Sequence, residues 1–174
     1  DLLGVLALES HRHRCMVIGQ HLGTVPDEVR SRLARTGVLS YRLLLFERDS
    51  AGEFKLPAEY PLDALVTATT HDLPTLAGFW EGHDLHLRHL LGQFADAGLA
   101  VALADRAEDR VRILRALERE RLAPGVTPNA ATARKVTDDV ALAIQAYLAR
   151  APSRVQVVQL EDVFGVSQQA NLPG

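Results

Sequence analysis

The sequence predicts an α/β domain built around a parallel sheet. Four short apolar runs, rich in β-branched and aliphatic residues, predict strands. Segments with helical patterns separate most of these runs. Alternation of strands and helices favours parallel strands joined by crossover helices. From the pattern alone, an open doubly wound sheet and part of a barrel fit equally well. The predicted strands cover residues 15–19, 39–46, 65–69 and 155–160.

Each element has a local justification, beginning with the amino-terminal half. Residues 2–13 form an amphipathic pattern that ends in a basic patch, and a helix is predicted there. A second helix starts near Thr24, a good cap, and Pro26 fits its first turn. We expect that helix to continue to Thr36, because Gly37 is a typical helix stop.

The second half is mainly helical between its two strands. A polar loop spans residues 48–61, and a short helix is expected from Pro74 to Trp80. Apolar residues recurring at helical spacing predict three further helices, with a break at Ala123-Pro124-Gly125. These helices are predicted over residues 84–94, 100–122 and 131–150.

Bulk composition excludes several classes of protein. With 174 residues and 47% hydrophobic residues, the chain has enough material for one domain with a core. A net charge of −3 without a basic stripe argues against nucleic acid, and the lack of a bilayer-length apolar run argues against a membrane span. The single Cys15 lies in an apolar run, which predicts a buried thiol in a cytoplasmic protein.

Polar residues follow three of the predicted strands where each strand ends. They are Gln20-His21 after the first strand, His71-Asp72 after the third and Glu161-Asp162 after the fourth. Since ligands bind at the carboxyl ends of strands in α/β proteins, this edge is the candidate site. Asp72 is either an acid in a pocket or the N-cap of the following helix. His71 either orients a substrate hydroxyl or is a buried histidine with satisfied hydrogen bonds, and the sequence alone favours the second.

Other polar features carry weaker signals. The spacing of His83, His86 and His89 on a helix is more typical of a solvated face than of a metal site, because the first and last diverge around the axis. His71 and Asp72 also resemble part of a metal phosphohydrolase site, but no convincing set of further ligands accompanies them. We therefore expect neither a metal nor a cofactor. The only Trp, Trp80, either stacks on a sugar or fills the core.

Several motifs in a fixed order resemble one known family. The chain is similar to the 4-alpha-glucanotransferases, also called amylomaltases or disproportionating enzymes, of the alpha-amylase superfamily. The resemblance covers essentially the whole chain. It rests on residues 16–26, 41–47, 57–61, 68–75 with Gly78-Phe79-Trp80, and the closing Asn171-Leu172-Pro173-Gly174.

The resemblance implies a fold and a reaction. The family fold is a (β/α)8 barrel, so residues 1–174 are expected to form one partial catalytic domain containing later strands of the barrel. A helical insertion, about residues 81–150, would lie between the last two strands. The family transfers α-1,4-glucan segments between maltooligosaccharides by a retaining double displacement. That chemistry needs a nucleophile and an acid/base about 5 Å apart, with a third carboxylate that stabilises the transition state.

The resemblance also assigns roles to individual residues. Asp72 matches the transition-state stabiliser, His71 its neighbouring sugar-binding histidine and Asn171 a substrate-contacting position. Gln20 occupies the position of the acid/base Glu, yet an amide has no ionisable proton to give. His21 stands where the family has Asp.

The expected nucleophile lies upstream of residue 1, as though the chain were cut from something longer. The isolated chain is therefore expected to be inactive. The alternative is a non-catalytic glucan-binding or structural fragment. Open sheet edges would favour self-association, unless the helices 100–122 and 131–150 cover them.

Overall fold

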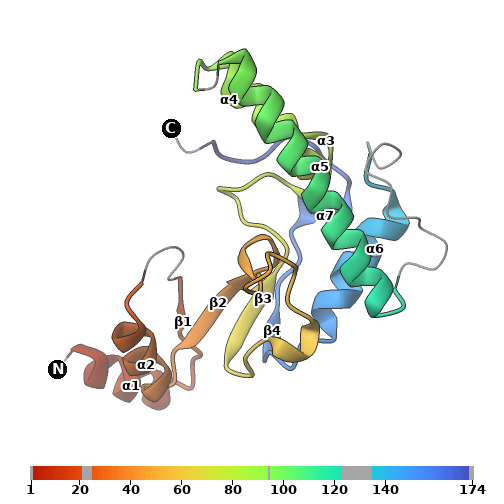
Figure 1. Cartoon of the computed structure of the whole chain (residues 1–174). Coiled ribbons are helices and arrows are strands. Elements are labelled where there is room, and N and C mark those ends of the chain that lie inside the picture. Colours follow the sequence, from red (N-terminus) through yellow and green to blue (C-terminus); the bar gives the residue numbers. More distant parts are fainter. Residues whose placement is uncertain (1, 21–24, 94, 123–134, 173–174) are drawn as a thin grey trace.

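The structure, a computed structural model, describes residues 2–20, 25–93, 95–122 and 135–172. Its described strands form one sheet in the order β1-β2-β3-β4, and every neighbouring pair is parallel (Figure 1). The prediction of an α/β fold with a parallel sheet is thus confirmed. The strands are β1 (Ile18–Gly19), β2 (Leu39–Leu43), β3 (Ala64–Thr67) and β4 (Val155–Gln156).

Helices α1 (Leu2–His13) and α2 (Asp27–Arg35) lie beside the β1 end of the sheet (Figure 1). The bounds of α1 agree with the prediction. Gly37, at a φ of 77°, follows the end of α2 as expected, because this left-handed backbone favours glycine. Pro26 precedes α2 as its N-cap residue instead of lying inside the first turn. The predicted cap Thr24 lies outside the described residues.

After the turn that follows β3, the described chain up to β4 is mainly helical, as predicted. Figure 1 shows the long helix α5 crossing one side of the molecule with α6 beside its carboxyl-terminal half. Part of the predicted helix 131–150, residues 131–134, is outside the described ranges, and α6 begins after Thr137, whose side chain accepts a hydrogen bond from Val140 N. The helices are α3 (Leu76–Glu81), α4 (His83–Leu90), α5 (Asp96–Arg119) and α6 (Asp138–Ala149).

All four predicted strands are too long, and the third, predicted over 65–69, already ends at Thr67. The run 15–19 pairs only at β1, which has one neighbour, and Cys15 is exposed, so the prediction of a buried thiol is wrong. After Leu43 the chain turns into a 3-10 helix at Leu44–Phe46. The last run, 155–160, leaves the sheet early because Leu160 already begins α7 (Leu160–Val163). Apolar runs therefore located the strands but not their ends.

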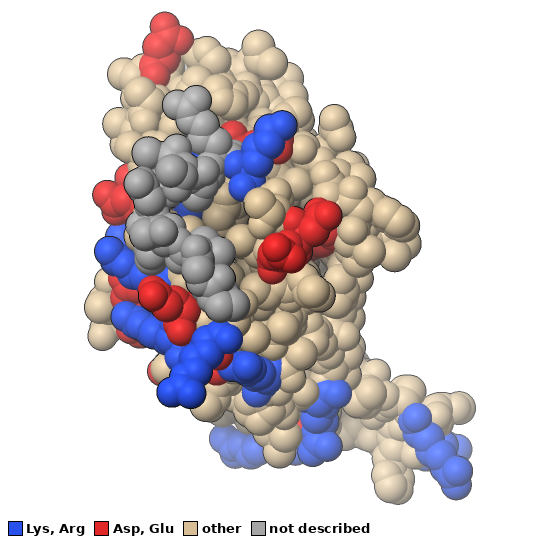
Figure 2. Space-filling model, turned by 90° about the vertical axis from the view of Figure 1, so that its right-hand side faces the viewer, with Lys and Arg blue, Asp and Glu red and all other residues tan. Residues whose placement is uncertain are grey.

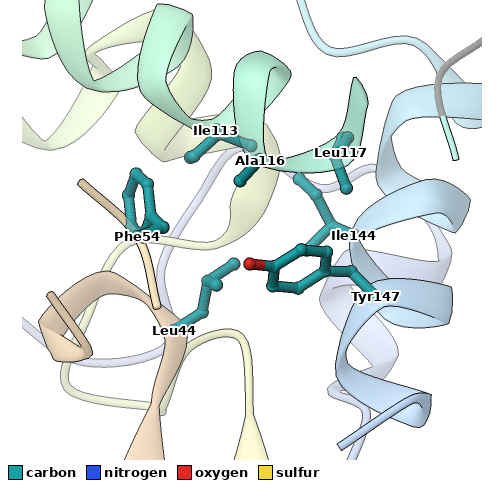
Figure 3. Close-up of a pocket in the computed structure, with 7 residues that line it drawn as sticks. All are labelled: Leu44, Phe54, Ile113, Ala116, Leu117, Ile144 and Tyr147. Carbon is teal, nitrogen blue, oxygen red and sulfur yellow. The ribbon is translucent and has the colours of Figure 1, made fainter. Parts of the chain in front are cut away.

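The core lies where α5 and α6 pack against β3 and the segment after β2. Figure 3 shows side chains from α5, α6 and the segment after β2 pointing toward one another around a small apolar void. The Tyr147 hydroxyl donates a 2.7 Å hydrogen bond to the Lys55 carbonyl, which ties α6 to the loop after β2. The void is lined by Leu44, Phe54, Ile113, Ala116, Leu117, Ile144 and Tyr147.

Two partly buried arginines connect α5 to α3 and α4. Arg106 forms a bidentate pair with Asp84 at 2.8 and 2.9 Å, and it also donates to the Phe79 carbonyl at 2.7 Å. Arg110 donates to the carbonyl of Trp80 at 2.7 Å. Such charge-assisted bonds satisfy carbonyls at the end of a short helix. Trp80 is 1% exposed, so it fills the core and does not offer a stacking face to a sugar.

The surface combines mixed charge with exposed apolar side chains. In Figure 2, basic and acidic side chains lie intermixed along one side of the drawn face. Apolar side chains are exposed on α1 and around the edge strands β1 and β4, including Met16 and Phe164. Within the described ranges, no helix is long and apolar enough to cross a membrane.

Two leucines on α6 test where the core lies. Leu148 is 1% exposed and packs in the core, whereas Leu142 on the same helix is 70% exposed. We expect Leu148→Ala to lower the free energy of unfolding by about 2–5 kcal/mol, because it leaves a cavity. The matched Leu142→Ala should stay within about 0.5 kcal/mol. Urea unfolding followed by circular dichroism measures both, and equal effects would contradict the assigned core.

Candidate functional site

The carboxyl edge of the sheet gathers the predicted polar residues. Because all four described strands are parallel, the residues that follow β1, β3 and β4 emerge at one edge. Gln20 directly follows β1, and the turn carrying His71 and Asp72 follows β3. The last described segment, which contains Asn171, returns to the same turn (Figure 1).

Three of the predicted site residues are in direct contact. The Asn171 side-chain amide donates a 2.6 Å hydrogen bond to Asp72 Oδ1, and the Asn171 backbone N–H donates to the His71 carbonyl at 3.1 Å. His71 Nε2 lies 3.3 Å from Asp72 Oδ2. The side chains of His71 and Asp72 are 67% and 40% exposed, so both reach solvent. The carboxylate is held in place on both oxygens and still accessible.

Asp72 does not cap the helix that follows it. The cap of α3 is Thr75, whose hydroxyl oxygen accepts a 3.0 Å hydrogen bond from Gly78 N. The N-cap interpretation of Asp72 is therefore wrong. His71 is exposed, so the buried-histidine interpretation is wrong too. Both residues are free to contact a ligand.

A buried carboxylate to which the sequence analysis assigned no role supports this turn. Asp162 in α7 accepts a 2.7 Å hydrogen bond from Leu76 N through Oδ1, and the Thr69 hydroxyl lies 3.3 Å from its Oδ2. Thr69 also donates to Gln159 Oε1 at 2.7 Å. Burial raises the pKa of Asp162, although its hydrogen bonds to Leu76 and Thr69 oppose the rise. The signal available in the sequence was an acid directly after an apolar run.

A second buried carboxylate lies beyond the end of β2. Glu47 lies between Lys55 Nζ at 2.7 Å and Arg42 Nη1 at 3.1 Å. Burial raises the pKa of Glu47, but the hydrogen bonds and charges of Lys55 and Arg42 outweigh it and leave the pKa below its ordinary value. This paired carboxylate fixes the chain after β2 and is not exposed to a ligand.

Gln20 lies at the same edge as Asp72 but not beside it. It is exposed and follows β1, whereas Asp72 follows β3, so one strand separates the two positions. Two interstrand spacings amount to about 10 Å. His21 lies outside the described residues.

The described groups suit hydroxyl recognition more than metal binding. Among the residues that the structure places, no three His, Cys, Asp or Glu side chains are grouped to hold a metal ion. Asp72 offers an anionic acceptor, and the exposed His71 imidazole and Asn171 amide lie against it. Sugars present many hydroxyls that both donate and accept, and this set of groups is complementary to them.

Comparison with known proteins places the whole chain in one group. A family model described as 4-alpha-glucanotransferase matches residues 1–174. A 4-alpha-glucanotransferase of Haemophilus influenzae is 37% identical over 173 residues, which is 99% of this chain and 25% of the relative. The chain thus spans about a quarter of the relative's length.

Solved structures agree with the sequence relatives. The crystal structure of amylomaltase from Corynebacterium glutamicum superimposes with a TM-score of 0.87 at 30% identity, covering 99% of this chain and 25% of that one. An amylomaltase from Streptococcus agalactiae in complex with acarbose has a TM-score of 0.50 at 19% identity, covering 90% of this chain and 25% of that one. This second likeness supports the fold alone.

The paired Glu47 makes stability depend on acid pH. The folded-state pKa of Glu47 lies below its unfolded-state pKa, which is ordinarily 4.5. The stabilisation from Glu47 is therefore complete above pH 4.5 and is lost as the pH falls through the folded-state pKa. We expect Glu47→Gln to destabilise the chain at pH 7 and to flatten the loss of stability below about pH 5.

Glu108→Gln is the control, because the ion pair of Glu108 with Arg112 is solvent-exposed. Surface pairs contribute only about 0–1 kcal/mol. Urea midpoints between pH 3 and pH 7 provide the measurement. If Glu47→Gln and wild type had parallel pH profiles, the assigned role of Glu47 would be wrong.

Proposed function

The chain belongs to the 4-alpha-glucanotransferase family, and from that premise we propose that it contributes the transition-state-stabilising part of a glucan-transfer site. The observation that carries the proposal is the contact of Asn171 and His71 with an accessible Asp72 carboxylate at the carboxyl edge of the sheet. The substrate class is an α-1,4-glucan or a maltooligosaccharide.

The chemistry explains why such a carboxylate is useful. Retaining transfer passes through an oxocarbenium-like transition state, in which the sugar ring becomes positively charged and distorted. An anionic oxygen fixed near that ring stabilises the developing charge more than it stabilises the ground state. Asn171 holds one Asp72 oxygen, so the carboxylate is oriented before the substrate arrives. His71 would bind a sugar hydroxyl beside it.

Gln20 sets the limit of what these residues can do. It occupies the acid/base position implied by the family motif, but an amide can neither protonate a leaving oxygen nor remove a proton from an acceptor. Loss of general acid catalysis typically costs about 10²–10⁴-fold in rate. With Gln20 in that position, the proposal is that the 174-residue chain binds glucan without transferring it.

The same proposal covers the architecture. The four parallel strands would be later strands of a (β/α)8 barrel, and residues 81–150 a helical insertion between the last two. Residues 1–174 would then form one partial catalytic domain of a cytoplasmic enzyme. The matched relatives are about four times longer than this chain, which leaves room for the remaining strands.

A second candidate function follows from Gln20 itself. If no catalysis is selected, the chain serves as a non-catalytic glucan-binding or structural fragment, and an amide at that position is tolerated. The two candidates differ in whether a longer protein containing these residues turns over glucan. A glucan-transfer part and a glucan-binding fragment both assign the glucan to Asp72, so one binding experiment tests this common part and separates it from a purely structural fragment.

Maltoheptaose binding tests that assignment. We expect nuclear magnetic resonance titration to show binding centred on Asp72, with affinity reduced roughly threefold to tenfold in Asp72→Asn, because a charge-assisted hydrogen bond is lost. Mass spectrometry of the same samples should show maltoheptaose unchanged.

Asp63→Asn is the matched control, since Asp63 directly precedes β3 and lies at the opposite end of the strand from Asp72. Its affinity should equal that of the wild type. If Asp72→Asn bound maltoheptaose as tightly as the wild type, the site assignment would be wrong. If maltooligosaccharides longer and shorter than maltoheptaose formed, the claim of inactivity would be wrong.

The exposed apolar edges lead to a separate expectation. Met16 and Ile18 at the β1 edge, and Phe164 beyond β4, are exposed, and α5 and α6 leave them uncovered. We expect the isolated chain to self-associate with micromolar or tighter affinity, because open edges and apolar patches seek partners. Light scattering coupled to size-exclusion chromatography measures the mass. A monodisperse monomer at 100 µM (a concentration of about 2 mg/ml for a 19.0 kDa chain) would refute the expectation.

A further inference from the structure

We propose that Asp162 is a positioning residue for the Asp72 carboxylate, acting by clamping both ends of the turn that carries it. The inference rests on the proposed function for the importance of Asp72, but its geometry is independent of any glucan. Asp162 takes no direct part in the site, since it is 6% exposed and lies behind the turn in α7.

The clamp is bidentate. Oδ1 of Asp162 accepts the backbone N–H of Leu76 at 2.7 Å, and Oδ2 lies 3.3 Å from the hydroxyl of Thr69. These two partners flank residues 70–75, the turn that contains His71 and Asp72. One side chain thereby fixes the separation of the two ends of the turn. Fixing both ends of a short loop removes most of its conformational freedom.

Further contacts join the same two segments. The Thr75 hydroxyl donates to the Val166 carbonyl at 2.5 Å, and Asn171 contacts both His71 and Asp72. A Cβ added to Gly78 would overlap the Ser167 carbonyl oxygen, so the backbones approach very closely here. Residues 69–78 and 159–171 therefore form one hydrogen-bonded unit, with Asp162 at its buried end and Asp72 at its exposed end.

The burial of Asp162 is not explained by an ion pair. Among the described residues, no Lys, Arg or His lies within ion-pair distance of it, although an unpaired buried carboxylate is unfavourable. The Thr69 hydroxyl has one proton, and its nearer acceptor is Gln159 Oε1 at 2.7 Å. Thr69 therefore donates more strongly to Gln159 than to Oδ2 of Asp162, and an amide at position 162 can donate to the Thr69 oxygen instead.

This hydrogen-bond logic distinguishes three variants. Asp162→Asn keeps an acceptor for Leu76 N and presents an amide donor to Thr69, so it should rescue the clamp. Asp162→Ala removes both contacts. Thr69→Val is nearly isosteric and removes only the hydroxyl link, so it gives a second test should the alanine variant fail to fold.

A control is available in the groove that Asp162 also lines. Asp139, in the first turn of α6, borders the same groove and is exposed. Asp139→Asn makes the same chemical change as Asp162→Asn at a position with no contact to the turn. An effect shared by Asp139→Asn and Asp162→Ala would assign the effect to the groove and overturn the proposal.

The test uses the 174-residue chain and two readouts. The first is the resonance of the Asn171 side-chain amide, which reports its 2.6 Å hydrogen bond to Asp72 without any ligand. We expect this signal to shift toward that of a free amide in Asp162→Ala and in Thr69→Val, and to stay in place in Asp162→Asn and Asp139→Asn. The second is the maltoheptaose affinity, expected to fall roughly fivefold in Asp162→Ala and less than twofold in Asp162→Asn.

The two readouts separate two failures. If the wild-type chain does not bind maltoheptaose, the proposed function fails, and the amide resonance still tests the clamp. If the Asn171 signal is unchanged in Asp162→Ala and Thr69→Val, the clamp is wrong whether or not glucan binds. If Asp162→Asn shifts the signal as much as Asp162→Ala, the assigned hydrogen-bond pattern is wrong.

Discussion

The hydrogen bonds between the chain after β3 and the chain after β4 are the constraint on which the site depends. Parallel pairing of Leu65 with Val155 brings the two strands together, and everything beyond their carboxyl ends follows from that register. The turn with His71 and Asp72 has little regular structure of its own. The turn acquires a defined shape because residues of α7 and of the segment after α7 form hydrogen bonds with it at several points. Loops that carry function are commonly held this way by a rigid scaffold.

The support costs some stability. Asp162 is buried without a cationic partner among the described residues, whereas Glu47, the other buried acid near this edge, lies between two cations. An apolar residue at position 162 would avoid burying a carboxylate, but it would leave the Leu76 N–H and the Thr69 hydroxyl without this partner. Retention of a polar group there makes physical sense where a backbone N–H and a hydroxyl need partners. Glu47 thus contributes to folding stability through its ion pairs, whereas Asp162 holds the shape of the turn.

The fold class and the exposed residues of the site were predicted from the sequence better than the buried residues that hold the site in place. The alternation of apolar runs and helical patterns predicted the parallel sheet, and ordered motifs pointed to His71, Asp72 and Asn171, which proved to be in contact. Strand ends were misjudged, since Leu160 looks as apolar as its neighbours yet begins a helix. The sequence offered Asp72 as a cap for the helix after Pro74, and only the backbone geometry shows that Thr75 is the cap. The role of Asp162 depends on partners 86 and 93 residues away, which no local pattern encodes.

The contact between Asn171 and Asp72 joins residues that are 99 positions apart. Such a contact closes a very long loop, so it forms late and slows folding relative to local helix formation. The entropic cost of closure grows only with the logarithm of loop length, and doubling the loop adds only about 0.6 kcal/mol. The helical segment between the two strands is therefore free to lengthen or shorten in evolution at little cost to the contact itself. The geometry around Asp72 therefore depends little on how many residues separate the turn after β3 from the segment that contains Asn171.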